Sequence, residues 1–83
     1  MWFVYLLECS DEQKSLYCGI TNDLEMRIKT HNSGKGAKYT KVRLPVNLYW
    51  FEEAEDRSLA SKREYQIKRL SRKEKLALKN PSN

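Results

Sequence analysis

An arginine and a histidine lie one helical turn apart where a helix should face the protein core. Arg27 and His31 share a stripe with Leu24 and Ile28, because the four positions follow the i, i+3, i+4, i+7 spacing. The pattern predicts a guanidinium held over a concave surface, where its planar fork can take phosphate oxygens. The alternative is structural: the arginine stem covers the core edge, and the histidine bonds a carbonyl near the helix end.

An acidic residue, Glu64, lies in the middle of a second predicted helix. It falls on the flank of the apolar stripe formed by Leu59, Ala60, Ile67 and Leu70. The structural interpretation is an ion pair with Lys68 at i+4, worth about 0.2–0.5 kcal/mol. Periodicity alone does not favour Glu64 over Glu74 as a functional acid.

Two tyrosines lie on the strands predicted before the first helix. Tyr5 and Tyr17 could simply pack in a sheet with exposed hydroxyl groups. Gly19 follows Tyr17 by two residues, and a glycine inside a strand often marks a bulge or a close backbone approach.

The segment 33–40 mixes glycine, lysine and an aromatic residue. Gly34 and Gly36 are available for left-handed positions after the helix. Lys35 and Lys38 could follow a nucleic-acid backbone while Tyr39 stacks on a base. The alternative is a flexible surface loop. The spacing of a P-loop is absent.

The composition indicates a basic intracellular domain. Sixteen Lys and Arg against eleven Asp and Glu give a net charge of +5, and residues 26–51 contain six basic residues and no acid. Clustered positive charge predicts a phosphate polyanion as partner. No apolar run approaches a membrane span, and no signal peptide is visible. We expect a cytoplasmic protein with reduced thiols and no Cys/His zinc site.

Hydrophobic periodicity and turn residues predict six elements in the order β-β-α-β-α-α. The strands are expected at Trp2–Leu7, Leu16–Ile20 and Val46–Phe51. The first helix is expected from 23 to 31 or 32, the second from a cap at Ser58 or Asp56 to about residue 70, and the third over 72–79. Asn22 is the expected N-cap of the first helix, with Glu25 as its capping-box partner. Ser58 or Asp56 is the expected N-cap of the second helix, and Ser71 that of the third.

These elements predict an α+β fold: a three-stranded antiparallel or mixed sheet packed with two to three helices. The first two strands should form an antiparallel hairpin. The length predicts a single domain over residues 1–83, with 79–83 as a polar tail.

Taken together, these residues resemble the GIY-YIG nuclease superfamily, and especially its small stand-alone bacterial members. Val4-Tyr5-Leu6 and Tyr17-Cys18-Gly19 stand where the family carries its two triplets. Arg27 and His31 on the first helix, and Glu64 on the helix after the third strand, match the remaining family positions. The resemblance covers residues 2–78.

The resemblance implies hydrolysis of nucleic-acid phosphodiester bonds, with DNA expected and no small-molecule cofactor. Glu64 would bind one divalent metal, Mg²⁺ or Mn²⁺. Arg27 would neutralise the transition state, and either Tyr5 or Tyr17 would be the general base with help from His31. Lys35, Lys38 and Tyr39 would hold the backbone.

Two other functions remain open. The chain could be a catalytically weak nucleic-acid-binding module of the same fold, or a basic adaptor for a protein partner. Whether it forms a homodimer is likewise left open by the sequence.

Overall fold

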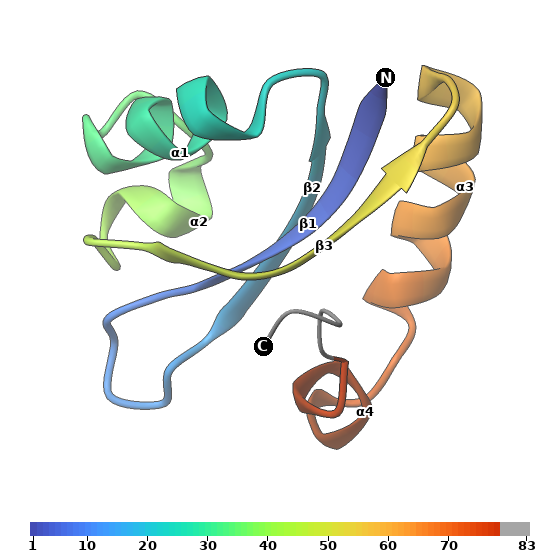
Figure 1. Cartoon of the computed structure of the whole chain (residues 1–83). Coiled ribbons are helices and arrows are strands. Elements are labelled where there is room, and N and C mark those ends of the chain that lie inside the picture. Colours follow the sequence, from blue (N-terminus) through green and yellow to red (C-terminus); the bar gives the residue numbers. More distant parts are fainter. Residues whose placement is uncertain (79–83) are drawn as a thin grey trace.

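Three antiparallel strands form the centre of the computed structural model, which describes residues 1–78 (Figure 1). β1 (Trp2–Glu8) lies between β2 (Leu16–Thr21) and β3 (Asn47–Ala54). The helices are α1 (Leu24–Asn32), α2 (Lys38–Lys41), α3 (Arg57–Lys68) and α4 (Arg72–Leu76). The predicted α+β fold and the predicted β1–β2 hairpin are confirmed, and both strand pairs are antiparallel.

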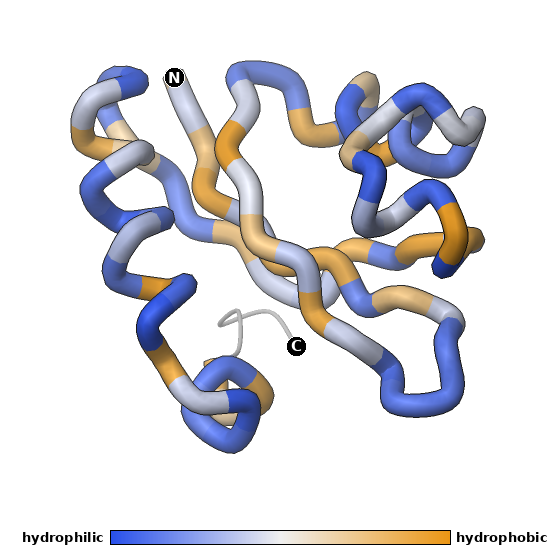
Figure 2. The backbone as a smooth tube through the Cα atoms, turned by 180° about the vertical axis from the view of Figure 1, so that it is seen from behind, coloured by the Kyte–Doolittle hydropathy of each residue, from blue (hydrophilic) through white to orange (hydrophobic). Residues whose placement is uncertain are grey.

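The central strand β1 has two buried faces, because side chains alternate along a strand. Val4 and Leu6 pack toward α3, where they form one core with Trp50, Ala60 and Ile67. Tyr5 and Leu7 pack on the other face with Cys9 and Val46. Figure 2 shows that hydrophobic residues concentrate along the strands, whereas the helices are largely hydrophilic.

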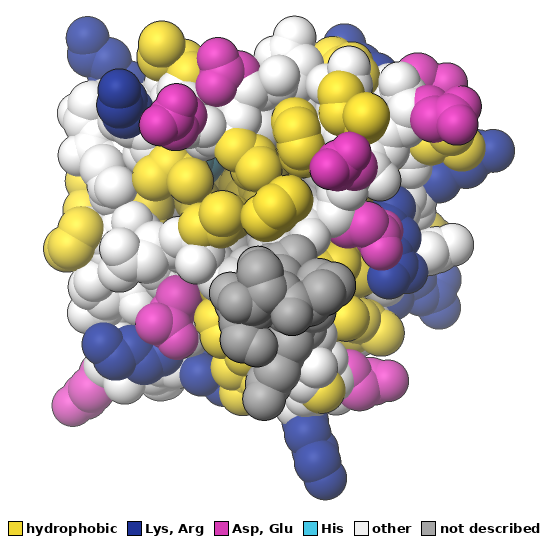
Figure 3. Space-filling model, in the orientation of Figure 1, with side chains coloured by type: hydrophobic (Ala, Val, Ile, Leu, Met, Phe, Trp, Pro, Cys, Tyr) yellow, Lys and Arg dark blue, Asp and Glu magenta, His cyan; other side chains and the backbone are white. Residues whose placement is uncertain are grey.

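The two faces of the sheet are covered by different helices. Figure 1 shows α1 and α2 at one side of the sheet and α3 and α4 at the other. The second core is incompletely closed, because Leu24, Ile28 and Phe51 pack against it while only partly buried. Apolar side chains accordingly gather over the centre of the face seen in Figure 3, with charged side chains around them.

The structure adds one helix to the predicted order and moves several boundaries. α2 occupies part of the segment predicted as a loop. Asp23, not Asn22, caps α1 by accepting a hydrogen bond from Met26 N at 3.1 Å. β3 continues to Ala54, beyond the predicted end at residue 51. Of the two caps considered for α3, Asp56 is the one observed.

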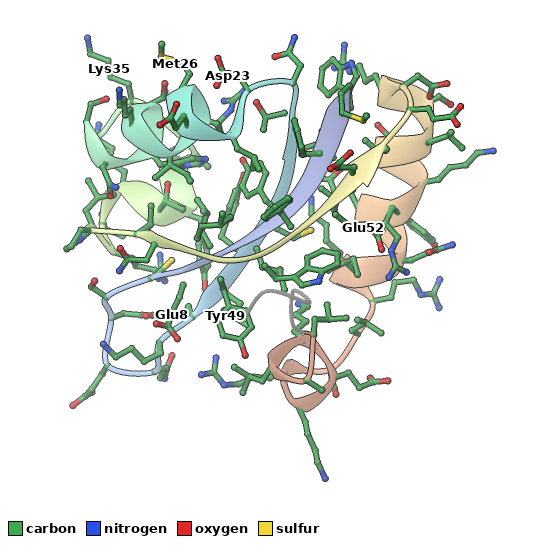
Figure 4. All side chains as sticks on the ribbon, viewed as in Figure 1. Glu8, Asp23, Met26, Lys35, Tyr49 and Glu52 are labelled. Carbon is green, nitrogen blue, oxygen red and sulfur yellow. The ribbon has the colours of Figure 1, made fainter. Side chains whose placement is uncertain are left out.

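The last helix is fixed to the rest of the fold at both of its ends. Ser71 and Glu74 form a capping box at the start of α4. The Tyr49 hydroxyl, which comes from β3, donates a 2.5 Å hydrogen bond to the Leu76 carbonyl (Figure 4). α4 ends at Leu76, so the predicted continuation of the helix over residues 77 and 78 is wrong, and residue 79 and the predicted tail 79–83 lie outside the described residues. None of the helices within residues 1–78 has the length and apolarity needed to span a bilayer.

Ile67 provides a test of the packing between α3 and the sheet. Its side chain is fully buried, so Ile67→Ala should lower the free energy of unfolding by about 2–5 kcal/mol through lost transfer energy and a cavity. Leu59→Ala on the same helix is the control, because Leu59 is 45% exposed and should cost no more than about 0.5 kcal/mol. Urea denaturation followed by circular dichroism measures both, and equal losses would contradict the described packing.

Candidate active site

Residues from five segments of the chain line one open cleft of about 370 Å³. β1 and β2 form its floor, α1 and the loop after it form one wall, and α3 forms the other. Figure 2 shows β2 passing between these two groups of helices. All five residues predicted to be catalytic lie here, together with Gly19 and Lys35; the lining is Tyr5, Tyr17, Gly19, Ile20, Arg27, His31, Lys35, Gly36, Ala37 and Glu64.

The histidine at the base of the cleft is almost completely buried, with 2% of its surface exposed. Its Nε2 lies 3.2 Å from the Tyr5 hydroxyl, and its Nδ1 lies 2.8 Å from Thr40 Oγ1. Thr40 in turn donates from Oγ1 to the Ala37 carbonyl at 3.0 Å. Both ring nitrogens of His31 therefore have partners inside the protein.

Only one tautomer of His31 is compatible with these three hydrogen bonds, of which two involve the imidazole and one joins Thr40 to Ala37. The single hydroxyl proton of Thr40 goes to the Ala37 carbonyl, so Thr40 Oγ1 must accept from a protonated Nδ1. Nε2 then carries no proton in the neutral ring and accepts from Tyr5. The site holds a tyrosine hydroxyl that already points its proton at an unprotonated nitrogen.

Burial keeps both members of the Tyr5–His31 pair neutral. Burial, with a smaller contribution from Arg27, lowers the pKa of His31 below its ordinary value of 6.5. Burial, followed by the nearby Tyr17, raises the pKa of the Tyr5 hydroxyl well above its ordinary value of 10.0. At neutral pH the imidazole is thus an acceptor and the phenol a donor.

Two glycines allow the backbone to pass close over this pair. A Cβ atom at Gly19 would lie 2.5 Å from the Tyr5 hydroxyl oxygen, and one at Gly36 would lie 2.3 Å from His31 Nδ1. The close approach predicted at Gly19 is therefore present. Gly34 adopts the expected left-handed conformation with φ of +82°, but Gly36 does not. At position 36 the absence of a side chain leaves room for the His31 ring.

Opposite charges stand on opposite walls of the cleft. Arg27 and Lys35 are exposed on the α1 side, and neither forms an ion pair or side-chain hydrogen bond with another residue among 1–78. Lys35 is labelled in Figure 4 at the outer side of α1. These two cations are available to a phosphate group.

Glu64, on the α3 wall, is the one carboxylate among the residues that line the cleft. Its Oε2 lies 3.3 Å from Lys68 Nζ, which confirms the predicted i+4 pair, and its side chain is 23% exposed. Glu74 instead serves in the α4 capping box. Residues 1–78 contain no cluster of three His, Cys, Asp or Glu side chains. A single carboxylate suits Mg²⁺, which usually keeps several waters and shares its remaining positions with substrate phosphates.

The aromatic residue of the basic segment is engaged within the protein. Tyr39 stacks on Tyr17 with ring centroids 5.9 Å apart, and the Arg43 guanidinium lies 3.9 Å from the Tyr39 centroid. Tyr17 also meets His31 edge-on at 5.4 Å. Neither Tyr39 nor the exposed Lys38 lines the cleft, so the structure separates them from Lys35.

Sequence reasoning did not identify Thr40 or Gly36 as parts of the site. Thr40 is fully buried in α2, and its role depends on the distant His31 rather than on any local motif.

Comparison with known proteins assigns the chain to a family. A family model described as the GIY-YIG catalytic domain matches residues 1–77, and the chain belongs to this family.

Within the family the chain is similar to bacterial UPF0213 proteins. One from Clostridium perfringens is 56% identical over 94% of this chain and 82% of its own length. One from Staphylococcus aureus is 53% identical over 92% of this chain and 90% of its own length. The solution NMR structure of a UPF0213 protein from Bacillus halodurans is 45% identical, has a TM-score of 0.53, and matches 90% of this chain and 79% of that one.

Gly36→Ala tests the close approach over the histidine. The new methyl group would overlap His31 Nδ1, so the imidazole ¹⁵N signals of the single histidine should shift and its bond to Thr40 should weaken. Gly34→Ala is the matched control: it should cost about 1–2 kcal/mol because of its positive φ, but leave the histidine signals in place. Unchanged signals in folded Gly36→Ala would contradict the geometry.

Thr40→Val tests the assignment of the tautomer. Valine has nearly the same shape as threonine but cannot accept from Nδ1. Long-range ¹H–¹⁵N correlation should show the Nδ1–H form in the wild type and in Thr40→Ser, and a mixture of tautomers in Thr40→Val. An Nε2–H form in the wild-type protein would show that Tyr5 is the acceptor rather than the donor.

Proposed function

We propose that this protein is a metal-dependent endonuclease that hydrolyses phosphodiester bonds in nucleic acid, with DNA as the expected substrate. One observation carries the proposal: a single cleft contains a neutral Tyr5–His31 pair between Arg27, which has no ion pair within residues 1–78, and Glu64, the one carboxylate among the described lining residues. Membership of the GIY-YIG family supports the nuclease class.

Glu64 would hold the divalent metal, Mg²⁺ or Mn²⁺, together with water and a substrate phosphate oxygen. When bound, such an ion polarises the phosphate and stabilises the leaving oxygen. The Lys68 side chain is 56% exposed, so its ammonium group can move away from the carboxylate without a large desolvation change.

Arg27 would bind the scissile phosphate from the opposite wall. Its guanidinium is exposed toward the cleft and can offer two parallel N–H groups to phosphate oxygens. Because extra negative charge develops on the phosphate during attack, this contact stabilises the transition state more than the ground state. Lys35 on the same wall would help to attract the backbone.

Tyr5 is the base that the hydrogen bonds favour, acting through His31. The phenolic oxygen would accept a proton from the attacking water while its own proton passes to Nε2. This route avoids a buried tyrosinate, which the raised pKa of Tyr5 opposes. The lowered pKa of His31 keeps Nε2 free at neutral pH and makes the imidazolium short-lived. Tyr17, beside the same imidazole, would contact the substrate.

Glu64→Gln separates a nuclease from a binding module of the same fold. The amide keeps the size of the side chain but loses the charge a hard cation requires. Metal-dependent cleavage of flap, branched, nicked or linear DNA should vanish, whereas DNA binding should persist or tighten. Loss of the Lys68 pair should cost only about 0.2–0.5 kcal/mol of stability.

Glu53→Gln is the matched control, because Glu53 is exposed on β3 and lies outside the cleft. It should cleave like the wild type. Equal cleavage by Glu64→Gln and Glu53→Gln, with equal Mg²⁺-induced amide shifts, would exclude Glu64 as the metal ligand. Binding without cleavage in the wild type would favour the non-catalytic module.

A further inference from the structure

A second concave surface lies next to the cleft, between the start of β2 and α4. It consists of two adjoining pockets of about 180 and 250 Å³ that share Leu16, Tyr39 and Lys75. We call this surface the α4 groove; its lining residues used below are Tyr17, Tyr39, Lys68, Arg72 and Lys75. It is not part of the cleft that holds the Tyr5–His31 pair.

The α4 groove is continuous with the cleft at two points. Tyr17 lines both the cleft and the larger pocket of the groove. Lys68 lines that pocket and forms the ion pair with Glu64, which lines the cleft. A polymer bound at Glu64 and Tyr17 can therefore extend directly into the groove.

The charge of the α4 groove is wholly positive. Among residues 1–78, Lys68, Arg72 and Lys75 line it, and no acidic side chain does. Within residues 1–78, Arg72 and Lys75 have no carboxylate partner. Lys75 is also only partly exposed and lines both pockets of the groove.

The groove exists before any ligand binds. Arg72 donates from Nη2 to the Gln13 carbonyl at 2.6 Å and from Nη1 to the Lys14 carbonyl at 3.2 Å. These bonds tie α4 to the turn between β1 and β2, and the Tyr49 bond ties the other end of α4 to β3. A fixed cationic surface loses little conformational entropy when it binds an anion.

We propose that the α4 groove binds the sugar–phosphate backbone of the nucleic-acid strand that leaves the catalytic cleft. This proposal rests on the proposed function. The groove offers ammonium and guanidinium groups, whereas its two large rings, Tyr17 and Tyr39, are stacked on each other, and Arg43 covers Tyr39. The groove therefore contacts phosphates rather than bases, and its binding does not depend on the base sequence of the strand.

The test compares two charge reversals on one helix. Lys75→Glu places an acid in the groove, whereas Lys73→Glu makes the same change on an exposed position of α4 that lines neither pocket. Binding of a labelled trinucleotide, which fills only the cleft, is compared with that of a strand of about 12 nucleotides. The milder Lys75→Gln repeats the test in case Lys75→Glu disturbs α4.

Lys75→Glu should weaken binding of the longer strand by roughly tenfold at low salt, and Lys75→Gln should lower its salt slope by about one contact. Both should leave trinucleotide binding unchanged, and Lys73→Glu should have little effect on either length. Arg27→Ala should weaken both lengths, because it acts in the cleft.

The outcomes separate the two proposals. Equal effects of Lys75→Glu and Lys73→Glu on the longer strand, with cleavage intact, would reject the groove and leave the nuclease standing. Failure of the wild-type protein to bind either length would reject both. Two results together would point to an acidic protein as the occupant instead. Polyglutamate would displace the longer strand from the wild type but not from Lys75→Gln, and the binding of longer strands would differ with their base sequence.

Discussion

The hydrogen-bond chain from Tyr5 through His31 to Thr40 is the constraint on which the rest of the site depends. A histidine buried to this extent must bond both ring nitrogens, because an unpaired buried polar group costs about 1–3 kcal/mol. Its two partners come from β1 and α2, so one imidazole fixes the central strand, α1 and α2 relative to one another. The same constraint requires glycine at positions 19 and 36, since a Cβ atom at either would overlap the side chain of Tyr5 or His31.

The site separates a neutral hydrogen-bonded pair from the charged side chains around it. The neutral Tyr5–His31 pair lies at the floor of the cleft, where burial raises the pKa of Tyr5 and lowers the pKa of His31, so that both stay uncharged. Arg27 and Glu64 lie on the walls, where solvent and a polyanionic ligand can reach them. This division lets one small cleft hold an arginine and a carboxylate without the two pairing with each other, because the sheet keeps α1 and α3 apart.

Local patterns in the sequence were sufficient to predict the three strands, the long helices and the shared stripe of Arg27 and His31, because these depend on periodicity. The choice of Glu64 as their partner came from the family resemblance, since periodicity did not favour it over Glu74. Local patterns did not predict α2, whose first residue follows Ala37 without a side-chain cap and whose burial depends on Thr40 meeting His31. The place of Tyr39 was equally out of reach. Its contact with Tyr17 joins residues 22 positions apart, and no local rule specifies such a contact.

The order of the strands also has a consequence for synthesis on the ribosome. β1 is the middle strand, yet its second partner, β3, is translated after β2 and both α1 and α2. A domain generally folds as a unit, so the sheet is complete only when β3 has been synthesised. The tyrosines, the histidine and Arg27 thus precede β3, while the Glu64 carboxylate follows it. A nascent chain therefore carries the cationic wall of the cleft, with Arg27 and Lys35, before it carries the Glu64 carboxylate of the opposite wall.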